Sequence, residues 1–195
     1  MSKPKPFLTK PKPFDDASFV PVPRVPEWPV YQPEQLPAHW KKIAEIENPR
    51  PVNHYHWDFY YDGKMLIIYH SSDSINEFNG KPHRHIEQYE FPIEAAAWFV
   101  DNLPRFFKKP DEEGALPIDK FHLRGSAGGE ELKIPRLVMT YAEGMPGYAL
   151  LNLSRCEHPN MDLCQSFEMS DEFLFKQGML ELFKDIAARH RDGTL

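Results

Sequence analysis

The sequence predicts an α+β protein of two repeats, each an antiparallel sheet backed by one helix, behind an extended, Pro-rich N-terminal arm. Three observations support this fold class. Aromatic, alternating segments flank an Asp-Gly pair at residues 62–63, which is typical of a hairpin turn. The same order of strands and one helix recurs in the second half of the chain. Ten of the 20 prolines fall within residues 1–40, where they prevent helix and central strand.

The first repeat begins with the hairpin and ends with a helix. Residues 54–61 and 64–70 are its first two predicted strands, and residues 83–91 form a third strand after a polar loop. Pro92 then opens a predicted helix over residues 92–107, because proline is tolerated in a first helical turn and apolar residues recur at helical spacing.

The second repeat has the same order of elements. Its predicted strands cover residues 120–129, 135–144, 148–156 and 161–169. A helix is predicted over residues 170–188, with Ser170 as its N-cap and acidic side chains in its first turn. The glycine-rich stretch at residues 125–131 lacks the lysine and hydroxyl residue of a phosphate-binding loop, so we interpret it as a hairpin tip.

Composition divides the chain into four segments. We predict an extended or disordered arm, a first sheet-helix unit, an acidic linker and a second unit over residues 1–40, 41–109, 110–118 and 119–195, respectively. The two units together are expected to form one compact domain.

The residues between the arm and the hairpin allow two structures. Residues 38–51 have apolar positions that suit a short helix ending before Pro49. The alternative is an opening strand within residues 43–53, which would complete a four-stranded first sheet.

The formal net charge of −6 is unevenly distributed along the chain. Residues 1–50 have 8 basic and 6 acidic side chains (+2), residues 51–109 have 6 and 8 (−2), and residues 110–195 have 9 and 15 (−6). An acidic body argues against tight binding to duplex DNA, where release of counterions dominates affinity. A local basic groove remains compatible with this charge.

The expected compartment is the reducing cytoplasm. No apolar run approaches the roughly 20 residues that span a bilayer, and the first residues lack the apolar core of a secretory signal. We expect the only two cysteines, Cys156 and Cys164, to be buried free thiols rather than a disulfide. The protein would be associated with a nucleoid or, if viral, lie in the host cytoplasm.

Alternation along the strands separates two faces of each predicted sheet. One face of the first hairpin is expected to pack against the helix and carries Tyr55, Trp57, Phe59, Leu66 and Ile68. Its outer face carries His56, Asp58, Tyr60, Ile67 and Tyr69. The outer faces are also expected to carry Arg84, His122, Arg124 and Arg155. Rings and cations on one face suit single-stranded nucleic acid, and they equally suit a face covered by another subunit.

The stretch DGKMLIIYHSSDSINEFNGKPHRHIEQYEFPIEAAAWFV resembles the repeat of Pur-type, Whirly and positive-cofactor transcription proteins, and some viral single-stranded-DNA-binding proteins. The resemblance covers residues 54–109 and, through the order of elements, residues 119–190. It implies two units of four strands and a helix whose curved sheets hold single-stranded DNA or RNA. The matching positions are the turn lysine Lys64, the basic strand residue Arg84 and the sheet aromatics Tyr60 and Tyr69.

We therefore hypothesise a single-stranded DNA-binding protein that acts in replication or transcription, with no cofactor. The predicted nucleic-acid-binding residues are His56, Tyr60, Lys64, Tyr69, Arg84, His122, Arg124, Arg136, Tyr141 and Arg155. The expected partners are single-stranded DNA, with RNA also open, further copies of the chain and a polymerase. No membrane is expected among them.

Two other classes compete with this hypothesis. The first is a protein-interaction or assembly module that binds no nucleic acid. The second is a cupin-like metal enzyme, because His54, His56, His83, His85 and Glu90 resemble part of a cupin metal motif. The glycine spacing and the helix that follows depart from that motif, and no catalytic set assembles elsewhere. We therefore expect no enzyme and no metal.

Overall fold

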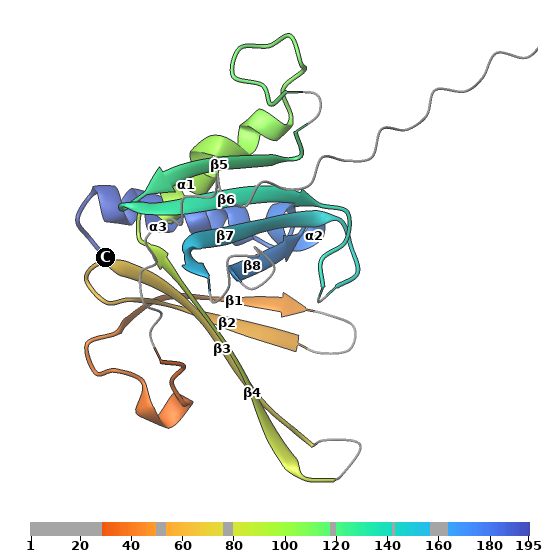
Figure 1. The fold of residues 1–195 in the computed structure, drawn as a ribbon. Coiled ribbons are helices and arrows are strands. Elements are labelled where there is room, and N and C mark those ends of the chain that lie inside the picture. The colour runs from red at the N-terminus through yellow and green to blue at the C-terminus, as the bar shows by residue number, and fades with distance from the viewer. Residues whose placement is uncertain (1–28, 50–53, 76–79, 118–119, 142, 157–163) are drawn as a thin grey trace, which may run out of the picture.

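The structure, a computed structural model, describes residues 29–49, 54–75, 80–117, 120–141, 143–156 and 164–195. It is an α+β fold of two four-stranded antiparallel sheets, each followed by a helix, and the helices pack together (Figure 1). The predicted fold class is confirmed. The arm predicted over residues 1–40 lies outside the described residues except for its last part.

The first sheet has the strand order β1-β2-β3-β4, and all neighbouring strands are antiparallel. Its strands are β1 (Lys41–Pro49), β2 (His54–Tyr61), β3 (Met65–Ile75) and β4 (Pro82–Pro92). β3 and β4 form the long hairpin that reaches away from the body of the molecule in Figure 1.

The turn between β2 and β3 lies one residue later than predicted. Tyr61 pairs with Leu66, which leaves Gly63 and Lys64 at the centre of the turn. Gly63 has a φ of 103°, a conformation that favours glycine. The Asp62 carboxylate accepts a hydrogen bond from the backbone N–H of Lys64 at 2.8 Å. Cross-strand partners shift by two positions, so every side chain keeps its predicted face.

Of the two structures considered for this region, the strand is the correct one, because most of residues 38–51 form β1. The apolar residues Ile43 and Ile46 are three positions apart, a spacing that suits a helix face. In the strand, a bulge between Lys42 and Ala44 absorbs the extra residue. Ile43 is thereby buried in the core and Ile46 packs against it. The first sheet thus gains its fourth strand.

The second sheet repeats the topology with the order β5-β6-β7-β8. Its strands are β5 (His122–Ala127), β6 (Glu130–Leu137), β7 (Gly147–Cys156) and β8 (Cys164–Ser170). The predicted hairpin tip is the two-residue turn Gly128-Gly129, with φ angles of 56° and 81°. β6 therefore begins five residues before the strand predicted from residue 135.

The helices are α1 (Ala95–Asn102), α2 (Asp171–Phe175) and α3 (Met179–Arg191), with short 3-10 turns η2 (Pro33–Gln35) and η3 (Leu103–Phe106). Ser170 caps α2 as predicted, because its hydroxyl accepts from the backbone N–H of Phe173 at 3.0 Å. Gly178, at a φ of 96°, divides the single helix predicted here into α2 and α3. No helix in the described ranges is long and apolar enough to cross a bilayer.

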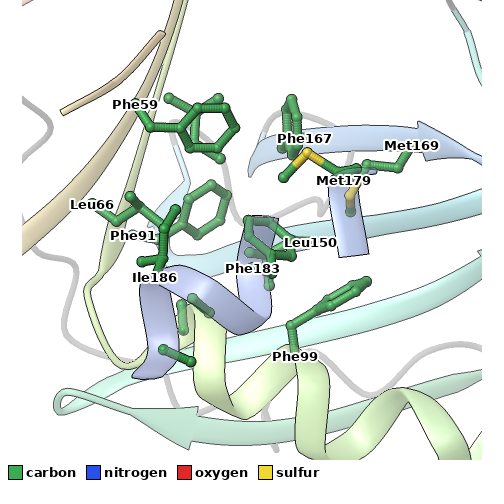
Figure 2. Close-up of a cluster of buried hydrophobic side chains, with 14 of the residues drawn as sticks. Phe59, Leu66, Phe91, Phe99, Leu150, Phe167, Met169, Met179, Phe183 and Ile186 are labelled. Atoms are coloured by element: carbon green, nitrogen blue, oxygen red, sulfur yellow. The ribbon is translucent and has the colours of Figure 1, made fainter. Parts of the chain in front are cut away.

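One hydrophobic core joins both sheets and the helices. Phe59 and Phe91 of the first sheet, Phe167 of the second and Phe183 of α3 converge in it (Figure 2). The ring centroids of Phe99 in α1 and Phe183 lie 5.3 Å apart. The predicted inner face of the first hairpin is confirmed, since its residues are buried in this core or pack against it: Tyr55, Trp57, Phe59, Leu66 and Ile68.

The expectation of two free thiols was wrong. Cys164 is disulfide-bonded, and the described part of the chain holds no free cysteine. The sequence contains one other cysteine, Cys156, whose backbone pairs with that of Cys164 across β7 and β8. The cysteines therefore do not support a reducing compartment.

Candidate nucleic-acid interface

The outer face of the first sheet is covered by residues 29–40, which we call the N-terminal strap. Trp40 is buried in a second apolar cluster with Met65 and Ile67. The Tyr31 ring lies 5.3 Å from the Trp40 ring, and the Tyr31 backbone N–H donates to the Gln88 side chain at 3.1 Å. The strap thus places its own side chains where an incoming ligand would contact the sheet.

The two tyrosines predicted to stack on bases lie beneath this strap. Tyr69 is only 3% exposed, and its hydroxyl donates to the Tyr31 carbonyl at 3.0 Å. Tyr60 is half-buried, with its ring centroid 5.8 Å from that of Trp40. Burial, and then the nearby Asp58 carboxylate, raise the pKa of Tyr60 to about 12. Both rings lie on the predicted face, but they are covered.

Acidic partners already occupy two of the predicted basic groups of the first sheet. Arg84 donates from Nε to Asp73 at 2.6 Å and from Nη1 to Glu34 of the strap at 2.6 Å. His56 lies 2.9 Å from both Glu47 and Asp58. Lys64 is exposed at the β2–β3 turn. Arg84 and His56 are therefore engaged in ion pairs on a face of mixed charge.

A possible metal cluster on this face contains a lysine. Glu45, His56 and Asp58 hold potential ligand atoms within 4.8 Å of one another. The Lys42 ammonium is bonded to both carboxylates, at 2.7 Å from Asp58, and these bonds hold the pKa of Lys42 well above its usual range. An ammonium therefore supplies the positive charge that a cation would bring.

The residues of the cupin-like motif serve separate contacts. His85 Nε2 lies 2.8 Å from the Glu87 carboxylate, whereas Glu90 is buried and accepts from Arg155 at 2.5 Å. His83 is exposed, and the side chain of His54 lies outside the described residues. His56, His85 and Glu90 are thus engaged by different partners.

Arg155, expected on the outer face, is 3% exposed and holds the two sheets together. It donates to Glu90 of β4 at 2.5 Å and, through two nitrogens, to Glu130 of β6 at 2.8 and 3.0 Å. Asn152 adds hydrogen bonds to the Glu90 carbonyl at 3.0 Å and to Glu130 at 2.6 Å. The expected outward orientation of Arg155 was wrong: an irregular register between Asn152 and Cys156 interrupts the alternation on which it rested.

The outer face of the second sheet carries cations that the strap does not contact in the described residues. Leu132 and Ile134 of β6 point into the core, so Lys133 between them points outward. Arg124 of β5 lies directly opposite Lys133. His122 shares the outward face of β5 with Arg124. Together with Lys120 just before the strand, these side chains form what we call the basic strip: Lys120, His122, Arg124 and Lys133.

The positive charges of the basic strip repel one another. Burial lowers the pKa of His122, and the charges of Lys133, Arg124 and Lys120 lower it further. Burial and then Arg124 also lower the pKa of Lys133. Arg124 Nη1 lies 3.8 Å from the Glu131 carboxylate. Like charges directly opposite each other destabilise a sheet, and an anion bound between them would relieve the repulsion.

Lys133 was missed because the second strand of this repeat was predicted too late in the chain. With β6 starting at Glu130, alternation with the apolar Leu132 and Ile134 would have placed Lys133 outward. The periodicity of the stretch ELKIP therefore contained the necessary signal.

Tyr141 and Arg136 lie apart from the basic strip. The Tyr141 side chain is 97% exposed, and its backbone N–H donates to the Glu168 carboxylate of β8. Arg136 forms a bidentate pair with Asp171, and its Cζ lies 4.6 Å from the centre of the Tyr148 ring. Of the ten predicted residues, the second sheet brings only His122 and Arg124 together on its outer face.

Comparison with known proteins adds no family to this picture. No protein family model matches the chain, and no curated protein matches it as a relative in sequence. Function is therefore inferred from the fold and from the chemistry of the basic strip.

Proposed function

We propose that the protein binds single-stranded nucleic acid, with DNA as the favoured ligand, across the outer face of its second sheet. The basic strip is the observation that supports this most, because Arg124 and Lys133 lie directly opposite each other and the neighbouring positive charges lower the pKa values of His122 and Lys133. The two sheet-helix units also agree with the resemblance to Pur-type and Whirly proteins, whose sheets bind such strands. The proposal includes a role in replication or transcription.

The binding chemistry follows from the row of side chains across the sheet. Arg124, Lys133, Leu151 and Ser166 are successive cross-strand neighbours on one face. Arg124 and Lys133 would contact phosphates, Leu151 would contact the apolar face of a base, and Ser166 would donate a hydrogen bond. The exposed ring of Tyr141 is a stacking platform, worth about 1–3 kcal/mol per base.

The experiment is a fluorescence-anisotropy titration of single-stranded and duplex oligonucleotides at two salt concentrations. We expect saturable binding of the single strand, weaker binding of the duplex, and a loss of affinity at the higher salt. The double variant Arg124→Ala/Lys133→Ala should reduce both the affinity and its dependence on salt.

The control variant is Lys184→Ala, which removes a half-exposed lysine of α3 that pairs with Glu181. It should leave binding unchanged. If the wild-type protein binds neither oligonucleotide at low salt, the proposal fails.

The competing assembly module has its own support. Val138, Met139 and Tyr141 are exposed on the segment between β6 and β7, and exposed apolar clusters mark interaction surfaces. Self-association and contact with a polymerase belong to the proposal in either case. Sedimentation velocity of the wild-type protein without nucleic acid would measure the first of these.

A further inference from the structure

A pocket of about 250 Å³ opens at one end of the second sheet. Its walls come from η3 and the segment after it, from the residues that lead into β5, and from β6 and β7. Arg105, Lys108, Lys120 and Arg136 contribute four cations to it, and none of the described residues that line it is acidic. Such a pocket favours an anion.

Three of these cations keep their charge available. Arg105 Nε donates to the Gly114 carbonyl at 2.9 Å, and Lys108 Nζ donates to the Glu113 carbonyl at 2.6 Å. Both acceptors are neutral backbone oxygens. In the described part of the chain, no salt bridge is formed by Arg105, Lys108 or Lys120, whereas Arg136 pairs with Asp171.

Aromatic rings form the apolar part of the pocket. One face of Tyr148 is occupied by the Arg136 guanidinium at 4.6 Å, and the Phe106 ring packs edge-on against Tyr148 with centroids 5.2 Å apart. Phe121 also lines the pocket and is 70% exposed. A flat ligand that covered the Phe121 ring would remove apolar surface from water.

We propose that this pocket binds a nucleoside monophosphate, with the base against Phe121 and the phosphate between Arg105, Lys108 and Lys120. The volume lies below the roughly 300–1,000 Å³ of sites for drug-sized ligands, so it suits a single nucleotide rather than a longer strand. Lys120 also belongs to the basic strip, so the pocket would receive the phosphorylated end of a strand that lies on the sheet. Binding of the free nucleotide does not depend on strand binding.

The test compares three probes by isothermal titration calorimetry with the full chain: dAMP, deoxyadenosine and inorganic phosphate. We expect dAMP to bind one site with a Kd below about 1 mM, more tightly than either fragment. In ¹⁵N-labelled protein, dAMP should shift the amide resonances of Lys120 and Phe121. Equal affinity for phosphate and dAMP, or no saturable dAMP binding, would overturn the proposal.

Variants separate the two parts of the site. Phe121→Ala should lower the affinity for dAMP at least about fivefold and leave the affinity for phosphate unchanged. Lys108→Ala should lower both affinities. Ile75→Ala, at an apolar residue that is also 70% exposed but lies at the end of β3, is the matched control for the ring. Lys184→Ala is the control for the charge. If the controls weaken dAMP as much, the site is not in this pocket.

The two proposals fail separately. Arg124→Ala/Lys133→Ala should weaken binding of the oligonucleotide, whereas the Kd for dAMP should stay within about twofold of the wild-type value. A protein that binds dAMP but no oligonucleotide would retain the pocket and lose the strand-binding function. A protein that binds the oligonucleotide but not dAMP would retain the strand-binding function and contradict the proposed nucleotide site.

Discussion

At the residue scale, Arg155 shows how a surface-like residue becomes structural. Its guanidinium bonds two buried carboxylates from different sheets, Glu90 and Glu130. Removing a charge from a buried network leaves its partners without compensation, which costs more than the intact network contributes. The change in stability therefore depends on whether Arg155 alone or the whole network of Arg155, Glu90 and Glu130 is replaced.

We expect Arg155→Ala to lower the free energy of unfolding by about 3–5 kcal/mol, because Glu90 and Glu130 remain buried and face each other's charge. Urea unfolding measures the change. Arg155→Met combined with Glu90→Gln and Glu130→Gln should recover part of the loss. Arg124→Ala, at an exposed arginine, is the control and should change stability by less than about 0.5 kcal/mol.

His122 gives the strand-binding proposal a dependence on pH. In the free protein its pKa is lowered by burial and by Lys133, Arg124 and Lys120. A bound phosphate would favour the protonated ring and raise this pKa, so binding takes up a proton. Affinity for single-stranded DNA should rise as the pH falls from about 7.5 to about 5.5, around the ordinary histidine pKa of about 6.5.

The measurement is the oligonucleotide Kd across this range for wild type and His122→Asn. The variant should lose most of the dependence. His56→Asn is the control, because His56 lies on the first sheet between two carboxylates. A dependence that persists in His122→Asn would place the titrating group elsewhere.

At the scale of the elements, the alternation of side chains along a strand could be predicted from the sequence, whereas contacts between segments far apart in the chain could not. The faces of β2 and β3 followed from the period of two, and a turn displaced by one residue did not change them. β1 could not be distinguished from a short helix, because its bulge gives the strand a helix-like apolar spacing. The strap could not be predicted from local alternation, since its contacts join segments far apart in the chain, such as Tyr31 with Gln88, which are 57 positions apart.

The strap leads to a prediction about Trp40. We expect Trp40→Ala to lower the free energy of unfolding by about 3 kcal/mol, since a buried ring beside Met65 and Ile67 would leave a cavity. It should also return water to Tyr60, so the pKa of Tyr60 should fall from about 12 toward its ordinary value. Ultraviolet titration of the native protein measures the second effect. An unchanged tyrosine titration would mean that Trp40 does not shield this ring.

At the scale of the whole molecule, the two sheets share one core although the sequence presents them as two repeats. Phe59, Leu150 and Phe183 belong to the same buried cluster and come from the first sheet, the second sheet and α3 (Figure 2). The ion pairs of Arg155 with Glu90 and Glu130 also join the two sheets. A shared core of this kind favours one cooperative unit of unfolding.

Native-state hydrogen exchange tests this cooperativity directly. The slowest amides of β2 and β6 should exchange with the same free energy, because neither sheet can expose its inner face while the other remains packed. Phe183→Ala should lower both values equally, by about 3–5 kcal/mol, and Ile75→Ala should lower neither. If Phe183→Ala lowered the exchange free energy of one sheet alone, the two repeats would be separate folding units that merely touch, and the basic strip would depend on the stability of the second sheet only.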